Sequence, residues 1–179
     1  SLLFVMLAWF MLPKFLEQPK YKVVRKENDI EIRKYDKILT SSVKVYGNQY
    51  NALRNGFQPL VRYIGAKERV SEKISMTAPV IQTTNDETEN WTVSFAMPSK
   101  YNIDNLPKPT NDDIYFEEIQ PSLAAVIRFS GVADTSLLNQ KASVLKRWLE
   151  LNGYTESSSP KFLFYNCLLY TSPSPRDIR

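Results

Sequence analysis

Apolar and polar residues alternate in several short segments of the chain, the pattern of β-strands that are buried on one face. The alternation is clearest in three segments, residues 30–35, 42–47 and 91–97. Weaker strand-like segments, bounded by turn residues, cover residues 73–83, 114–119, 125–131 and 161–165. Residues 102–113 contain two prolines and are predicted to be a loop. Strands therefore dominate the predicted fold.

Two segments have helical periodicity instead. Residues 48–64 stop at Gly65 and residues 135–151 stop at Asn152, both suitable residues for a helix end. Helical winding brings the main apolar residues of the first segment onto one stripe, which should face the sheet: Leu53, Phe57, Leu60 and Ile64. Gly56 and Pro59 are poor residues for a helix interior, so a kink near Gln58 is expected.

The order of these elements repeats along the chain. A strand, a strand ending in glycine, a helix and a stop at glycine occur once in residues 30–65 and again in residues 114–153. This pattern indicates duplication of one supersecondary unit. The predicted fold class is α+β, built from a duplicated strand–helix–strand unit whose antiparallel or mixed sheet curls into a barrel.

The two ends of the chain differ from this middle part. Residues 2–12 are almost all apolar but fewer than the about 20 residues of a full membrane span. An uncleaved membrane anchor is the preferred interpretation of residues 1–19, with a signal-peptide remnant or a packed helix as alternatives. The expected location is therefore membrane-anchored or exported, in the periplasm or cell envelope if the source is bacterial. The side of the membrane stays open.

Residues 167–179 read CLLYTSPSPRDIR, a sharp change in composition. They resemble translated sequencing-adapter DNA, and a natural Ser/Pro-rich disordered tail is the alternative. The folded domain is therefore expected to be residues 20–166, and Cys167 is given no functional role.

The composition excludes several kinds of metal and catalytic site. The 179 residues suit one domain, and they include no histidine and one cysteine. Imidazole metal sites, catalytic triads that need histidine and an internal disulfide are thereby excluded. The net charge of +4 is spread without a basic run, which disfavours nucleic acid as partner and favours an anionic ligand or membrane surface. The 10 Tyr and 9 Phe suit a large core or a pocket for a flat molecule.

One flank of the first predicted helix has the composition of a ligand surface. Arg54 and Arg62 lie two turns apart, roughly 12 Å along the axis, with Val61 and the edge of Phe57 between them. Guanidinium groups bind carboxylates bidentately, and the apolar middle suits a ring face. The alternative is that these arginines are the solvated side of an amphipathic helix.

Several ordered motifs resemble the SOUL family of haem-binding proteins across residues 21–166. They are Ile32-Arg33-Lys34-Tyr35, Ala52-Leu53-Arg54, Tyr63-Ile64-Gly65, Ile74-Ser75-Met76-Thr77-Ala78-Pro79-Val80, residues 91–98, Leu106-Pro107 and Arg128-Phe129-Ser130-Gly131. The resemblance implies a distorted β-barrel flanked by two helices and non-enzymatic binding of haem or a related tetrapyrrole along the first helix. The resulting contact set is Leu53, Arg54, Phe57, Gln58, Val61 and Arg62.

This chain also departs from the family pattern in two ways. Without histidine, the axial ligand of a haem iron would be tyrosine, methionine or absent, and Met76 is the nearest candidate by motif. Relatives continue after the position of Asn166 with a further strand, so an unpaired sheet edge is expected here.

Two other functions stay open. A sensor or effector-binding domain for amphiphilic molecules is possible because gyrase-inhibitor-like domains share the duplicated unit. A tetrapyrrole dechelatase is the enzymatic alternative, but Glu72, Glu117 and Glu118 have no evident partner group in the sequence. The kind of tetrapyrrole and the oligomeric state are not determined.

Overall fold

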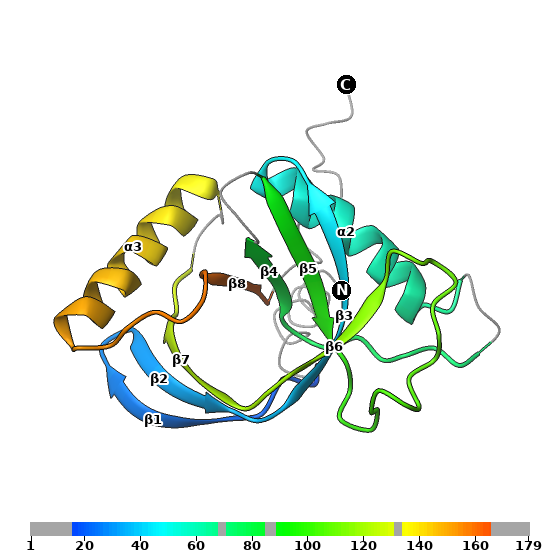
Figure 1. Ribbon diagram of the computed structural model, residues 1–179, viewed down its shortest axis with the longest axis horizontal. Coiled ribbons are helices and arrows are strands. Elements are labelled where there is room, and N and C mark those ends of the chain that lie inside the picture. Colours follow the sequence, from blue (N-terminus) through cyan, green and yellow to red (C-terminus); the bar gives the residue numbers. More distant parts are fainter. Residues whose placement is uncertain (1–15, 68–70, 85–88, 131–133, 166–179) are drawn as a thin grey trace, which may run out of the picture.

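Two antiparallel sheets and two helices make up the described part of the chain, residues 16–67, 71–84, 89–130 and 134–165 of a computed structural model (Figure 1). The elements are β1 (Tyr21–Glu27), β2 (Ile30–Tyr35), β3 (Ile38–Tyr46), α2 (Gln49–Ile64), β4 (Val80–Thr84), β5 (Asn90–Ala96), β6 (Tyr115–Ile119), β7 (Ser122–Ile127), α3 (Thr135–Leu151) and β8 (Lys161–Phe164). The small sheet has the strand order β1-β2-β7, and the large sheet has the order β6-β3-β5-β4-β8.

The two sheets are joined by one bent ladder. Tyr35 pairs with Ser122 at the end of the small sheet. Ile38, three residues later, pairs with Ile119, three residues earlier, at the start of the large sheet. The register is therefore continuous across the bend, and the pairs β2–β7 and β3–β6 are two arms of one ribbon (Figure 1).

The predicted barrel is wrong in one respect, because the described strands do not close. In the described part of the chain, β7 pairs only with β2, and β8 pairs only with β4. No described strand joins these two edges, so the α+β class is confirmed as two separate sheets. The sheet edge expected from a missing strand after Asn166 concerns residues outside the described ranges, so it stays a prediction, as does the duplication of the unit.

Strand β1 was not predicted. All seven of its residues are exposed, and three of them are Lys or Arg. A register shift between Val23 and Arg25 also breaks the two-residue period. Periodicity therefore gives no signal for β1, whose place is set by main-chain pairing with β2.

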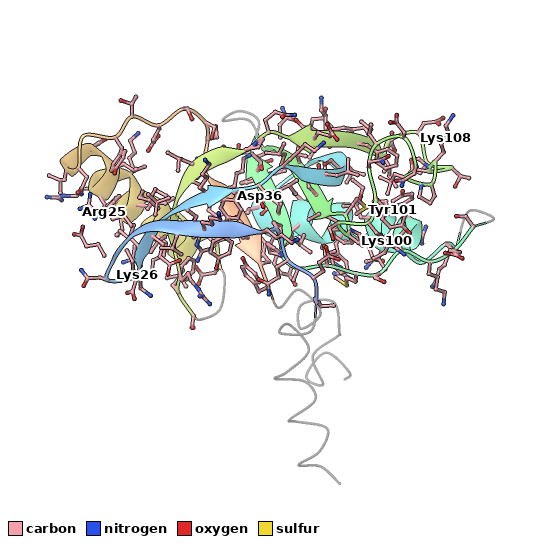
Figure 2. All side chains as sticks on the ribbon, turned by 90° about the horizontal axis from the view of Figure 1, so that it is seen from below. Arg25, Lys26, Asp36, Lys100, Tyr101 and Lys108 are labelled. Carbon is pink, nitrogen blue, oxygen red and sulfur yellow. The ribbon has the colours of Figure 1, made fainter. Side chains whose placement is uncertain are left out.

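Helix α3 has the predicted bounds, and its N-terminus is capped by Asp134, whose Oδ1 accepts a hydrogen bond from the Leu137 N–H at 2.8 Å. Seen from below, α3 lies at one end of the molecule beside Arg25 of β1, while the loops with Lys100 and Lys108 lie toward the other end (Figure 2). The Arg25 guanidinium stacks over Trp148 at 5.3 Å and donates to the Asn152 side chain at 3.0 Å. These contacts tie α3 to the small sheet.

Neither helix in the described ranges is long and apolar enough to cross a membrane. The predicted anchor falls mostly on residues 1–15, which lie outside the described residues. The membrane tether therefore stays a prediction.

Helix α2 packs on β3 and β5 of the large sheet. Its N-cap is Asn48, whose Oδ1 accepts from the Asn51 N–H at 3.0 Å, and Gly65 is its C-cap, as predicted. Of the predicted stripe, Phe57, Leu60 and Ile64 are buried, and Leu53 is half-buried at its border. Helical structure continues through Pro59 to Ile64. The stripe is therefore confirmed in its middle and C-terminal part.

Gly56 lets α2 approach the sheet closely. A Cβ atom added at Gly56 would lie 2.6 Å from both Cβ and Cγ2 of Val93 on β5, and Val93 is fully buried. The Cβ of a strand residue cannot move without the strand itself. A glycine inside this helix is therefore explained by a backbone contact, although glycine weakens helices in general.

We expect Gly56→Ala to destabilise the protein. The gain in helix propensity is at most about 1 kcal/mol, and overpacking of a core costs about 1–3 kcal/mol, so the clash should dominate. Denaturant unfolding should show a net loss, while Asn55→Ala at the exposed neighbour should change stability little. In a Val93→Ala background the loss should shrink but not disappear, because alanine removes Cγ2 and keeps the Cβ atom that lies 2.6 Å from the added group. An unchanged or raised stability of Gly56→Ala alone would contradict the close approach.

Candidate functional site

The predicted ligand flank of α2 lies on the surface. Arg54, Gln58 and Arg62 are exposed, and Leu53 and Val61 are half-buried against the core. Helix α2 lies beside β3 and β5 of the large sheet (Figure 1), and the exposure of Arg54, Gln58 and Arg62 shows that this flank faces away from the core. Five of the six predicted contact residues are therefore at least partly accessible from one side of one helix.

Phe57 is the exception, because its side chain lies in the core. Its side chain is only 5% exposed, and its ring packs edge-on against Phe95 at 5.3 Å between centroids. The ring fills the space between α2 and β5. A ligand on the α2 flank would therefore not contact Phe57 in this conformation, and Leu53 and Val61 remain as the apolar contacts.

The flank is positively charged without compensation from its own helix. Arg54 and Arg62 are the only charged residues between Gln49 and Ile64. Arg62 lies in the last turn, where the helix dipole favours a cation. An anionic group that approaches α2 therefore meets two guanidinium groups and no carboxylate of that helix.

Met76 lies in the segment before β4, partly buried against the main core cluster. The next residue, Thr77, is buried, and its hydroxyl donates to the Ala96 carbonyl at 2.6 Å. The Met-Thr-Ala-Pro-Val motif therefore has a structural role here, as an anchored segment that leads into the large sheet.

A groove of about 850 Å³ lies on the other face of the large sheet, opposite α2. Its lining is mixed, with polar residues such as Lys44, Thr92 and Lys161 beside Tyr46, Ile81, Tyr115 and Ile119. Glu117 and Glu118 also line it, and Glu118 is paired with Lys37 at 2.9 Å. The expectation that Glu118 lacks a partner was therefore wrong. One signal for this face is present in the sequence, namely the polar residues that alternate with apolar ones along β3 and β5.

A buried ion pair lies in the small sheet. The Arg33 side chain is 2% exposed, and its Nε donates to Glu31 Oε2 at 2.9 Å. Nη1 of Arg33 donates to the Tyr35 hydroxyl at 3.1 Å, and the guanidinium lies 4.2 Å from the ring centroid of Tyr21. Sequence motifs included Arg33 without indicating this burial.

The charge states in this cluster follow from its contacts. The Arg33 hydrogen bond lowers the pKa of Glu31, and burial opposes this only in part. Burial disfavours the charged form of Arg33, but its hydrogen bonds with Tyr35 and Glu31 outweigh burial and raise the pKa of Arg33. Burial also raises the pKa of the Tyr165 phenol. The pair is therefore fixed in its ionised form, which suits a structural role better than proton transfer.

No group of three or more His, Cys, Asp or Glu side chains that could hold a metal ion occurs among the described residues. With histidine absent from the whole sequence, the available chemistry on the α2 flank is recognition by arginine and apolar side chains.

Fold and surface thus define an α+β protein with a cationic, partly apolar helix flank, a class suited to binding a small anionic amphiphile. The model of the SOUL heme-binding protein family matches residues 16–178, and the chain belongs to this family. The match extends beyond Asn166 into the residues predicted to be a foreign tail, so the domain boundaries stay predictions.

Comparison with other known proteins supports the fold and no particular activity. No curated protein matches this chain. Among solved structures, a hydrolase from Listeria innocua is similar with a TM-score of 0.53 at 8% sequence identity, over 79% of this chain and 87% of that chain. This identity is too low to transfer an activity.

We expect Glu31→Gln to reduce stability by about 1–3 kcal/mol at neutral pH, because Arg33 then loses a charged partner in a buried site. Folding lowers the pKa of Glu31. The contribution of the Glu31 charge to stability is therefore complete above the ordinary pKa of 4.5, and it is lost as the pH falls through the lower pKa of the folded state. The unfolding free energies of Glu31→Gln and of the unmodified protein should therefore become equal in acid. Glu27→Gln, in an exposed pair with Arg25, is the control and should have little effect. A difference that stays constant down to pH 2 would contradict this role.

Proposed function

We propose that this protein binds haem or a related tetrapyrrole without catalysis, on the exposed flank of α2. The observation that carries the proposal is the pair Arg54 and Arg62, exposed two turns apart on a helix without acidic residues, with Val61 beside them. Membership of the SOUL family supports the ligand class.

The residues present fit a tetrapyrrole that carries carboxylates. The two guanidinium groups would bind the propionates, and Leu53 and Val61 would contact the edge or face of the macrocycle. Gln58 lies between the arginines on the same flank and can hydrogen-bond a carboxylate oxygen. Any iron chemistry would come from the haem itself, and the protein would orient it.

The apolar part of this surface is narrow because Phe57 lies in the core. Macrocycle contact is then limited to two aliphatic side chains that are already half-buried. We therefore propose affinity in the micromolar range, not the tight binding of an enclosed pocket.

Haemin titration of the protein should give a saturable, red-shifted Soret band. Arg54→Glu should weaken binding about tenfold, because it replaces attraction of a propionate by repulsion. The double variant Arg54→Glu/Arg62→Glu should weaken binding further. Arg147→Glu, an exposed charge reversal on α3, is the matched control and should bind haemin like the unmodified protein.

Equal affinity for haemin in the unmodified protein and in the double α2 variant would reject this placement while leaving haem binding intact. Absence of any saturable Soret shift in the unmodified protein would reject the proposed function itself.

We expect Met76→Leu to leave the haemin affinity and the ferric Soret maximum unchanged, since Met76 packs against the core. Leucine preserves most of the packing, so the fold should persist. Magnetic circular dichroism of the ferric complex would detect loss of a sulfur ligand. A changed spectrum in Met76→Leu at unchanged thermal stability would instead assign Met76 to the iron.

A second candidate function is binding of a different small amphiphile, as a sensor or effector-binding domain. The groove opposite α2 favours this function, since it is a second concave surface with its own polar lining. A dechelatase has no such observation, and release of metal from a tetrapyrrole over time is the assay that would reveal it. Membrane attachment through residues 1–19 and an envelope location are separate proposals that rest on the apolar N-terminal sequence.

A further inference from the structure

Four polar side chains form one row across the groove of the large sheet. Lys44 on β3 pairs with Thr92 on β5, and Thr92 pairs with Thr83 on β4. Thr83 in turn pairs with Lys161 on β8. All four residues line the groove on the face opposite α2. The row therefore reads lysine, threonine, threonine, lysine.

The spacing of this row suits a single small ligand. Neighbouring strands lie about 4.8 Å apart, so the lysine Cα atoms at its two ends lie roughly 14 Å apart. A lysine side chain reaches roughly 6 Å on a flexible four-carbon stem. Both ammonium groups can therefore reach a ligand that lies over Thr83 and Thr92, and the Thr83 hydroxyl can donate to it.

The charge of the row favours an anion. In the described part of the chain, neither Lys44 nor Lys161 has a carboxylate within ion-pairing distance. Of the two acids in the groove, Glu118 is already paired with Lys37. Glu117 pairs in register with Thr40, four residues and about 13 Å along β3 from Lys44. The lysine end of the groove is therefore cationic, and an oxyanion bound there would relieve the repulsion between two like charges.

Hydroxyl groups also lie beneath the row. Ser42 and Ser94 are buried and hydrogen-bonded to each other at 2.7 Å, and Thr40 lies 3.3 Å from the Ser42 hydroxyl. Of these three residues, Ser94 lines the groove. The groove also has aromatic and aliphatic lining, from Tyr46, Ile81, Tyr115 and Ile119, so a ligand there can carry an apolar part beside its anionic group.

We propose that this groove is a second binding site, for a small molecule with a phosphate or carboxylate group, held by Lys44 and Lys161 over Thr83 and Thr92. It is separate from the tetrapyrrole surface on α2, which lies on the other face of the same sheet, and it does not depend on the proposed function.

Inorganic pyrophosphate and citrate are the two probes, and they distinguish phosphate from carboxylate as the recognised group. Each is titrated into the full-length, ¹⁵N-labelled protein at constant ionic strength. At least one probe should shift the amide signals of Thr83 and Thr92 saturably. Lys44→Gln/Lys161→Gln removes both charges at similar side-chain length and should weaken that probe at least tenfold, with an unchanged thermal unfolding midpoint.

Arg54→Gln/Arg62→Gln is the matched control, because it removes the same charge from the other face of the sheet. This variant should bind the probe with unchanged affinity, and the lysine variant should bind haemin with unchanged affinity. Equal affinity for both probes in the lysine variant and the unmodified protein would overturn the proposal, as would amide shifts confined to α2. Loss of haemin binding in the lysine variant would also overturn it, by making the groove the tetrapyrrole site.

Discussion

The contact between α2 and β5 at Gly56 decides which residues this protein presents to a ligand. With Gly56 pressed against Val93, the helix has one rotational setting on the sheet, and Phe57 and Leu60 must then enter the core. The opposite flank, with Arg54 and Arg62, is left in solvent as a consequence of that setting. A helix held farther from the sheet could rotate, and its arginine pair would have no fixed orientation. The close backbone approach is thus the basis of the proposed ligand surface.

The large sheet uses its two faces for different purposes because side chains alternate along each strand. On the α2 face, Val43, Val93 and Phe95 complete an apolar core. On the other face the same strands place hydroxyl and ammonium groups in the groove. In the small sheet, Arg33 and Glu31 of β2 are buried as an ion pair with complementary hydrogen bonds, and a one-residue slip of β2 would move both charges to its other face.

Local periodicity was sufficient for most elements, since a helix or strand that buries one face must repeat its apolar residues at a fixed interval. The predicted range 135–151 coincides with α3, and exposure of Arg54 and Arg62 followed from the same winding. Non-local arrangements were not accessible in this way. Strand β1 is held by pairing alone, closure of the barrel depends on edges far apart in the chain, and the groove exists only because β8 lies next to β4. Phe57 lies at the border between the apolar stripe and the arginine flank of α2. Only the packing of its ring on Phe95 therefore decides that the side chain enters the core.

Binding without histidine constrains how a tetrapyrrole could be held. An imidazole–iron bond normally fixes position and orientation together, and here both must come from surface contacts. Exposed arginine–carboxylate pairs contribute only about 0.2–1 kcal/mol each. Contact of the macrocycle with Leu53 and Val61 would contribute about 25 cal/mol for each Å² of apolar surface buried, part of which offsets the loss of ligand freedom. In the proposed complex, apolar contact would add to the affinity from the arginine pair, and the arginine pair would determine the orientation of the ligand. A surface of this kind releases its ligand readily, which suits exchange of a tetrapyrrole between partners better than permanent retention of a prosthetic group.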